Sequence, residues 1–157
     1  MKTKVKKPYL LLVAAIVLWC AFIFSNSCVS REASGEVSGS ISGPLTPLLE
    51  ALFGADAATA DVIVRKCGHL LEFSLLGFLV CRLVRKIKTN VGRSYDAHGA
   101  LFALLVGVFD EYIQSFTGRG SQVQDVLIDF VGAMLGFGIC FGVSSLAQNY
   151  KKKRINS

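Results

Sequence analysis

Charged residues are scarce in this sequence, and long stretches carry none. Asp, Glu, Lys and Arg make up 18% of the 157 residues, against about a quarter in a typical soluble domain. The mean hydropathy is +0.52, and the apolar residues are gathered in blocks. This composition excludes an ordinary soluble domain. The length suits one domain, which we predict to span residues 1–157.

Motifs of several enzyme and metal-binding classes are also missing. The sequence has no CxxC pair, no HExxH zinc motif, no Walker phosphate loop and no nucleophile elbow. Three of the five cysteines, Cys20, Cys81 and Cys140, lie inside apolar runs, where a thiol behaves as a small hydrophobe. A disulfide between Cys28 and Cys67 stays open. We predict no metal and no other cofactor, and enzyme activity is undecided.

Four apolar blocks are present instead, each near the ~20 residues that a helix needs to cross a bilayer. They cover residues 9–26, 67–84, 97–116 and 126–147. We predict an all-α integral membrane protein built as a four-helix transmembrane bundle. An alternative treats the first block as a signal peptide, because Ser25 and Ser27 have the spacing of a cleavage site before Cys28. Cleavage there would leave the topology of the other blocks unchanged.

The basic residues are distributed unevenly around these blocks. Thirteen of the 17 precede the first block, lie at the end of the second block or between it and the third, or follow the fourth. The other four are Arg31, Arg65, Lys66 and Arg119. By the positive-inside rule, both termini are predicted to be cytoplasmic in a bacterial cell membrane. The net charge of +6 therefore reflects topology rather than nucleic-acid binding.

A long extracytoplasmic loop is expected after the first span. Residues 30–47 are rich in Ser, Gly and Pro, which favours irregular structure. Residues 45–54 have a short apolar face suited to the membrane surface.

Polar residues recur at helical spacing in the last three spans. Those that share a face within each span are Arg65, His69 and Glu72, then Asp110, Glu111 and Gln114, then Asp125 and Asp129. With a rise of ~1.5 Å per residue, Glu72 and Asp110 both lie ~20 Å from the cytoplasmic edge. These two acids are therefore expected at matching depth in the outer half of the membrane.

Ionised groups that face lipid are costly, so these side chains should face the bundle or a wet pocket. We predict an outward-facing polar site whose binding residues are Arg65, Lys66, His69, Glu72, Asp110, Glu111, Gln114, Arg119, Asp125 and Asp129. If the site is catalytic, the candidates for acid–base chemistry or for binding a divalent metal are His69, Glu72, Asp110 and Glu111.

Glycines recur in the fourth span, where Gly132 and Gly136, and then Gly138 and Gly142, are four residues apart. Small residues at this spacing let helices approach closely. We expect them to serve helix packing, and they leave a homodimer open.

Three stretches resemble the VanZ-like family of bacterial membrane proteins. They are "FSNSCVSREASGEVS", "RKCGHLLEFSLLGFL" and "DEYIQSFTGRGSQVQDVLIDFVGAMLG". Two positions depart from the family pattern, which has a proline where this chain has Thr117 and often a histidine where it has Ile113. The family's founding member gives low-level resistance to the glycopeptide antibiotic teicoplanin. The resemblance implies a membrane protein linked to cell-envelope or glycopeptide response, without a known reaction.

Three hypotheses follow for the polar site. It could bind the anionic head group of an envelope lipid or lipid-linked precursor through Arg65, Lys66 and Arg119. It could belong to an intramembrane hydrolase or transferase that acts on a lipid-linked substrate. It could also be a purely structural polar staple between helices.

Overall fold

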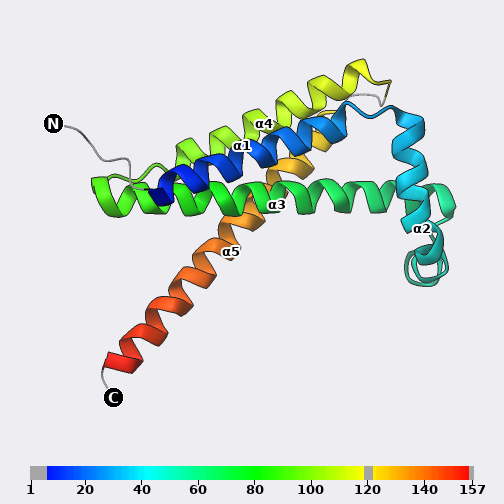
Figure 1. The fold of residues 1–157 in the computed structure, drawn as a ribbon. Helices are drawn as coiled ribbons and strands as arrows, with labels where there is room; N and C mark the ends of the chain where they lie inside the picture. The colour runs from blue at the N-terminus through cyan, green and yellow to red at the C-terminus, as the bar shows by residue number, and fades with distance from the viewer. Residues whose placement is uncertain (1–6, 119–121, 156–157) are drawn as a thin grey trace.

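The structure, a computed structural model, describes residues 7–118 and 122–155. These residues form five α-helices and no strand: α1 (Lys7–Ser27), α2 (Arg31–Phe53), α3 (Ala57–Val91), α4 (Asp96–Phe116) and α5 (Val123–Ile155) (Figure 1). Four of them, α1, α3, α4 and α5, are long and apolar enough to cross a membrane. The all-helical prediction with four apolar spans is therefore confirmed, whereas the side of the membrane on which each terminus lies stays a prediction.

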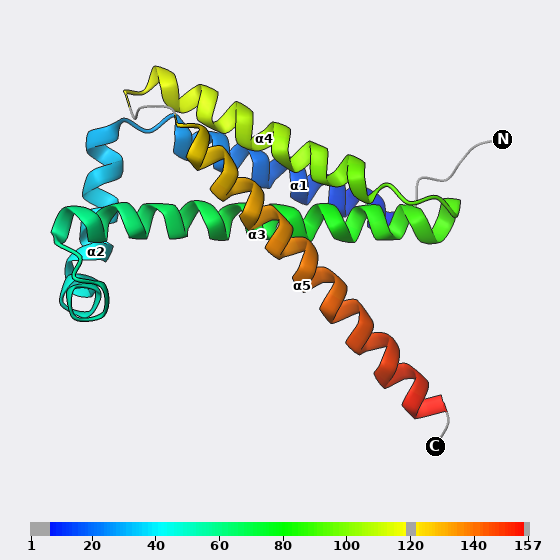
Figure 2. The same cartoon turned by 180° about the vertical axis from the view of Figure 1, so that it is seen from behind.

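Helix α3 forms the centre of the molecule and contacts each of the other four helices. Helices α1 and α4 lie along one side of α3, and α5 crosses it obliquely before diverging (Figures 1 and 2). At ~1.5 Å per residue, the 35 residues of α3 extend over roughly 50 Å. Because a hydrocarbon core is ~30 Å thick, α3 must project beyond it or tilt.

The outside of the bundle is apolar. Large hydrophobic side chains are exposed along every membrane-length helix, including Leu11 in α1, Leu71 in α3, Phe109 in α4 and Ile139 in α5. A soluble protein rarely exposes such continuous apolar surface. The buried hydrophobic core is correspondingly small, with Phe73, Leu76 and Cys81 fully buried. This pattern suits a surrounding lipid solvent.

Glycines allow the backbones of α5 and α3 to approach closely where the two helices cross. A Cβ atom on Gly132 would meet the backbone of Leu70, and one on Gly136 would meet the backbone of Ser74. From the other side, a Cβ on Gly77 would meet the backbone of Ala133. The first pair of fourth-span glycines therefore serves packing within the chain, as expected. The second pair, Gly138 and Gly142, has open space around it among the described residues.

The segment after α1 differs from the sequence-based prediction. Residues 31–53 form helix α2 and not a loop, and Ser30 caps its first turn by accepting a hydrogen bond from the Ala33 N–H. Ser and Gly favour helices weakly, and α2 even contains Pro44 and Pro47. Packing overrides this propensity, because α2 lies against α3 through small buried residues that include Ser38 and Ser42. All five cysteines carry free thiols, so Cys28 and Cys67 are not bridged.

Candidate functional site

Buried polar side chains meet where α1 ends and α5 begins. Asp110, Gln114, Asp129 and Ser27 are all at most 5% exposed, and His69 lies among them. They come from four different helices. We call these five residues the polar cluster.

Asp110 is held by two neighbours in the polar cluster. Its Oδ1 accepts a short hydrogen bond from the Ser27 hydroxyl, and its Oδ2 accepts one of 2.7 Å from the Gln114 amide. The same amide nitrogen lies 3.2 Å from the Ser27 oxygen. The three side chains thus form a closed triangle between α1 and α4, which fixes the orientation of the Asp110 carboxylate.

His69 lies between two carboxylates. Its Nδ1 is 3.2 Å from Oδ1 of Asp129 on α5 and 3.9 Å from Oδ2 of Asp110 on α4. Asp129 is fully buried, and its second oxygen, Oδ2, has no hydrogen-bond partner among the described residues. One ring nitrogen of His69 on α3 therefore lies close to an acid of α4 and to an acid of α5.

Adjacent acids in α4 have different surroundings. Asp110 faces the polar cluster, whereas Oε1 of Glu111 accepts a hydrogen bond of 2.5 Å from the backbone N–H of Gln122. Glu111 thereby ties the end of α4 to the residues just before α5. Lys66 makes a second tie, because its Nζ lies 2.7 Å from Oδ1 of Asp125 in the first turn of α5. Neither Lys66 nor Asp125 belongs to the polar cluster.

Beside the cluster is a cavity of about 290 Å³ between α1, α2 and α3, which we call the polar cavity. Its polar lining includes Asn26, Ser27, Arg65, His69 and Glu72. Asn26 donates a hydrogen bond of 2.9 Å to the Glu72 carboxylate, and Arg65 lies 4.0 Å from Asp61. Its apolar lining comes mainly from Val37 and Ile41 of α2 and Val64 of α3. The lining therefore combines charged and polar side chains with apolar ones.

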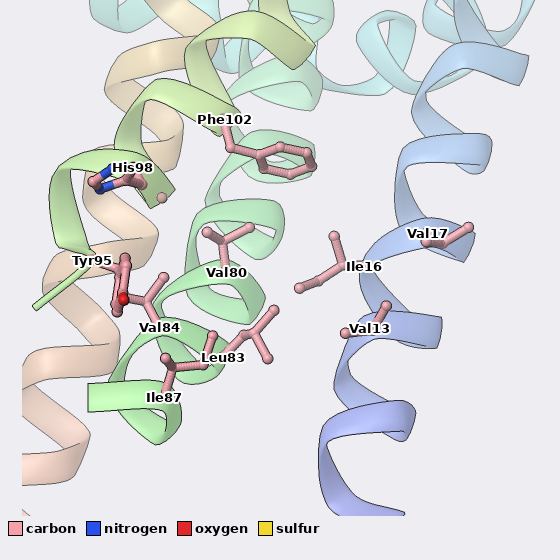
Figure 3. Close-up of a pocket in the computed structure, with 11 residues that line it drawn as sticks. Val13, Ile16, Val17, Val80, Leu83, Val84, Ile87, Tyr95, His98 and Phe102 are labelled. Atoms are coloured by element: carbon pink, nitrogen blue, oxygen red, sulfur yellow. The ribbon is translucent and has the colours of Figure 1, made fainter. Parts of the chain in front are cut away.

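A second cavity, of about 470 Å³, lies further along the bundle between α1, α3 and α4. In Figure 3, Val13 and Ile16 of α1 face Val80 and Leu83 of α3 across the gap. Its lining is almost wholly hydrocarbon, with Tyr95 and His98 as the exceptions. We call it the apolar cavity, and its lining offers no comparable cluster of hydrogen-bonding or titratable groups.

The predicted site residues thus separate into groups. His69, Asp110, Gln114 and Asp129 come together in the polar cluster; Arg65 and Glu72 line the polar cavity; Lys66, Asp125 and Glu111 tie helices together nearby. Arg119 lies outside the described residues.

Sequence reasoning missed Asn26 and Ser27 at the end of α1. Both bond to acids on other helices, Asn26 to Glu72 and Ser27 to Asp110. The available signal was that two polar residues end an uncharged span at the same depth as those acids. The spacing of Ser27 before Cys28 suggested a cleavage site instead.

Comparison with known families gives one match. A family model described as VanZ/LLP1 matches residues 12–146, a range that contains the polar cluster and both cavities. No curated protein and no solved structure matches the chain significantly.

Proposed function

We propose that this chain, which belongs to the VanZ/LLP1 family, binds the anionic head group of a cell-envelope lipid in the polar cavity. The chain is a multi-pass membrane protein, and by the positive-inside rule this cavity faces the outer leaflet. The bound lipid would be a phosphate-bearing lipid or a lipid-linked envelope precursor. This binding would connect the protein to cell-envelope or teicoplanin-type glycopeptide response in bacteria.

The observation that carries the proposal is the mixed lining of the polar cavity, which brings charged and apolar side chains together. A lipid has a charged head and an apolar tail, and the cavity places Arg65 and Asn26 near Val37 and Ile41. The apolar cavity of Figure 3 has no comparable mixture of charged and apolar side chains.

Arg65 is the residue best placed to bind phosphate. A guanidinium has five N–H donors in a planar fork that suits phosphate oxygens. The contact of Arg65 with Asp61 is 4.0 Å long, at the limit of an ion pair, and its side chain is 30% exposed. Lys66 is a weaker candidate, because its ammonium group is held by Asp125.

Binding of a polyprenyl phosphate to the purified chain in nanodiscs tests this role. Arg65→Ala should weaken binding by about tenfold or more, since a charge-assisted hydrogen bond contributes roughly 1.5–3 kcal/mol. Arg93→Ala removes the same charge from an exposed position beyond α3, and its affinity should match the wild type. Equal affinities for Arg65→Ala and the wild type would overturn the proposal, as would equal binding of a zwitterionic lipid such as phosphatidylcholine.

The competing account is a purely structural staple. On that account, Arg65→Ala and His69→Ala would change thermal stability without changing lipid affinity. The second alternative, an intramembrane hydrolase or transferase, is favoured by one contact, the 3.2 Å approach of His69 to Asp129. A carboxylate beside an imidazole can orient it as a general base. Turnover of a lipid-linked substrate that is lost in Asp129→Asn would support that alternative.

A further inference from the structure

Three side chains of the polar cluster have the composition of a metal site. His69, Asp110 and Asp129 each offer one ligand atom, and these three atoms all lie within 4.8 Å of one another. They come from α3, α4 and α5, so the site depends on the packing of the bundle and not on a local sequence motif. This spacing across three helices explains why the sequence contains no local metal-binding motif for these residues.

We propose that His69, Asp110 and Asp129 bind a divalent transition-metal cation, with Zn²⁺ as the best fit and Mn²⁺ as the next. Imidazole nitrogen suits Zn²⁺, and carboxylate oxygen suits both Zn²⁺ and Mn²⁺. Three protein ligands with one position open to solvent or substrate is the usual arrangement of a reactive zinc site. The proposal goes beyond head-group binding and does not depend on it.

The orphaned oxygen of Asp129 is an independent reason to expect a cation. Asp129 is fully buried, yet its Oδ2 has no hydrogen-bond partner among the described residues. Buried polar atoms are almost always satisfied, because desolvation without a partner is costly. A Cβ atom on Gly107 would lie 3.7 Å from this oxygen, and Gly107 precedes Asp110 by one helical turn. Oδ2 therefore faces the helix that carries the second acidic ligand.

Charge balance points the same way. Two buried carboxylates share one imidazole, which supplies at most one positive charge. Of the basic side chains nearby on α3, Lys66 pairs with Asp125, and Arg65 lies beside Asp61 and lines the polar cavity. Uncompensated charge in a membrane interior is costly, and a divalent cation would neutralise both acids at once.

The neighbours of Asp110 provide the support that metal ligands need. The Ser27 hydroxyl and the Gln114 amide donate to its two oxygens and so fix the carboxylate. Such outer contacts orient ligands and raise metal affinity. His69 and Ser27 also line the polar cavity, so the proposed site borders the space where a phosphate oxygen or water would bind.

Metal binding to the full chain, purified in detergent and stripped with a chelator, tests the inference. Dialysis against Zn²⁺ should leave one tightly held ion per chain, measured by elemental analysis. Asp129→Asn keeps the shape of the side chain and should weaken binding by at least about tenfold, the low end of the effect of removing even an outer-shell partner. Asp125→Asn, one turn earlier in α5, should bind Zn²⁺ as the wild type does.

A spectroscopic measurement on the wild type tests the inference even if Asp129→Asn fails to fold. Co²⁺ added to the stripped wild type should give visible d–d absorption of a low-coordinate site, without thiolate charge transfer, and Zn²⁺ should displace it. The absence of a thiolate band excludes binding by the five cysteines. A spectrum of hydrated Co²⁺, no retained Zn²⁺ or Mn²⁺, or equal affinities for Asp129→Asn and wild type would each overturn the inference. Lipid binding that survives such a failure would leave the head-group proposal intact.

Discussion

The polar and apolar cavities lie against the same central helix but have opposite chemistry. Between residues 64 and 72, α3 presents Arg65, His69 and Glu72 to the polar cavity; between residues 80 and 87 it presents only aliphatic side chains to the apolar one. The glycine crossing of α5 over Leu70, Ser74 and Phe78 begins within the first stretch and ends before the second. The same helix thus borders a cavity with charged side chains at one stretch and a cavity lined by hydrocarbon at another.

The two histidines of the chain sharpen this contrast. His69 lies within 4.0 Å of two carboxylates from different helices. His98 borders the apolar cavity, is exposed, and has an edge-on contact with Tyr95 at a centroid distance of 5.5 Å. Acids from two other helices thus converge on His69, at one end of this bundle.

The largest effect is expected from removing the acid at the centre of the polar cluster. Asp110→Ala leaves Ser27, Gln114 and His69 without a shared partner, and the loss of one member of a buried charged network costs about 3–5 kcal/mol. Unfolding in detergent with the chelator present measures this loss. Stability equal to that of the wild type would mean that the cluster does not hold the helices together.

The same acid should be harmful in the other cavity. Val80 is 4% exposed and lines the apolar cavity. Val80→Asp should lower the free energy of unfolding by at least about 2.5–3.5 kcal/mol, the cost of an aspartate in a membrane-spanning helix. Val80→Leu serves as the control, with a much smaller change. If Val80→Asp unfolds like the wild type, the apolar cavity is wet and the contrast between the cavities is false.

A smaller effect is expected at the glycine crossing of α5 over α3. Gly136→Ala forces α5 away from the backbone of α3 and should cost about 1–3 kcal/mol, as overpacking usually does. Gly138→Ala, two residues away with open space around it, should be neutral or slightly stabilising. Equal losses in both variants would show that α5 does not pack on α3 through the face that contains Gly136.

The smallest effect is expected at the ion pair of Lys66 and Asp125. Both side chains are about one-third exposed, at 37% and 29%, and exposed pairs contribute roughly 0–1 kcal/mol. A double-mutant cycle of Lys66→Ala and Asp125→Ala in high and low salt measures the coupling. A coupling as large as the loss in Asp110→Ala would place this pair within the polar cluster energetically.

Much of the fold could be predicted from the sequence because hydropathy determines where a chain crosses lipid. Each of the four predicted spans lies within an observed helix, although α3 and α5 extend well beyond theirs. Helix α2 could not be predicted in this way, since its Ser, Gly and Pro residues favour loops and its helix depends on packing against α3.

The candidate site was predictable in composition but not in pairing. Helical spacing placed His69, Asp110 and Asp129 on polar faces, because periodicity identifies one face of one helix. Periodicity could not show which acid His69 would meet. The contact of His69 with Asp129 depends on how α5 crosses α3. Ser27 was missed because a small polar residue at the end of a span is also typical of a signal-peptide cleavage site.

Mapping where an anionic lipid contacts the chain tests the central claim most directly. A phosphatidic acid analogue with a photoreactive group at the head-group end of its acyl chain would be crosslinked to the wild type in a bilayer, and the labelled residues identified by mass spectrometry. We predict labelling concentrated at the polar cavity, on Val37, Ile41 and Val64, and reduced in Arg65→Ala. Labelling spread evenly over lipid-facing residues such as Leu105 and Phe109, and unchanged in Arg65→Ala, would contradict the account.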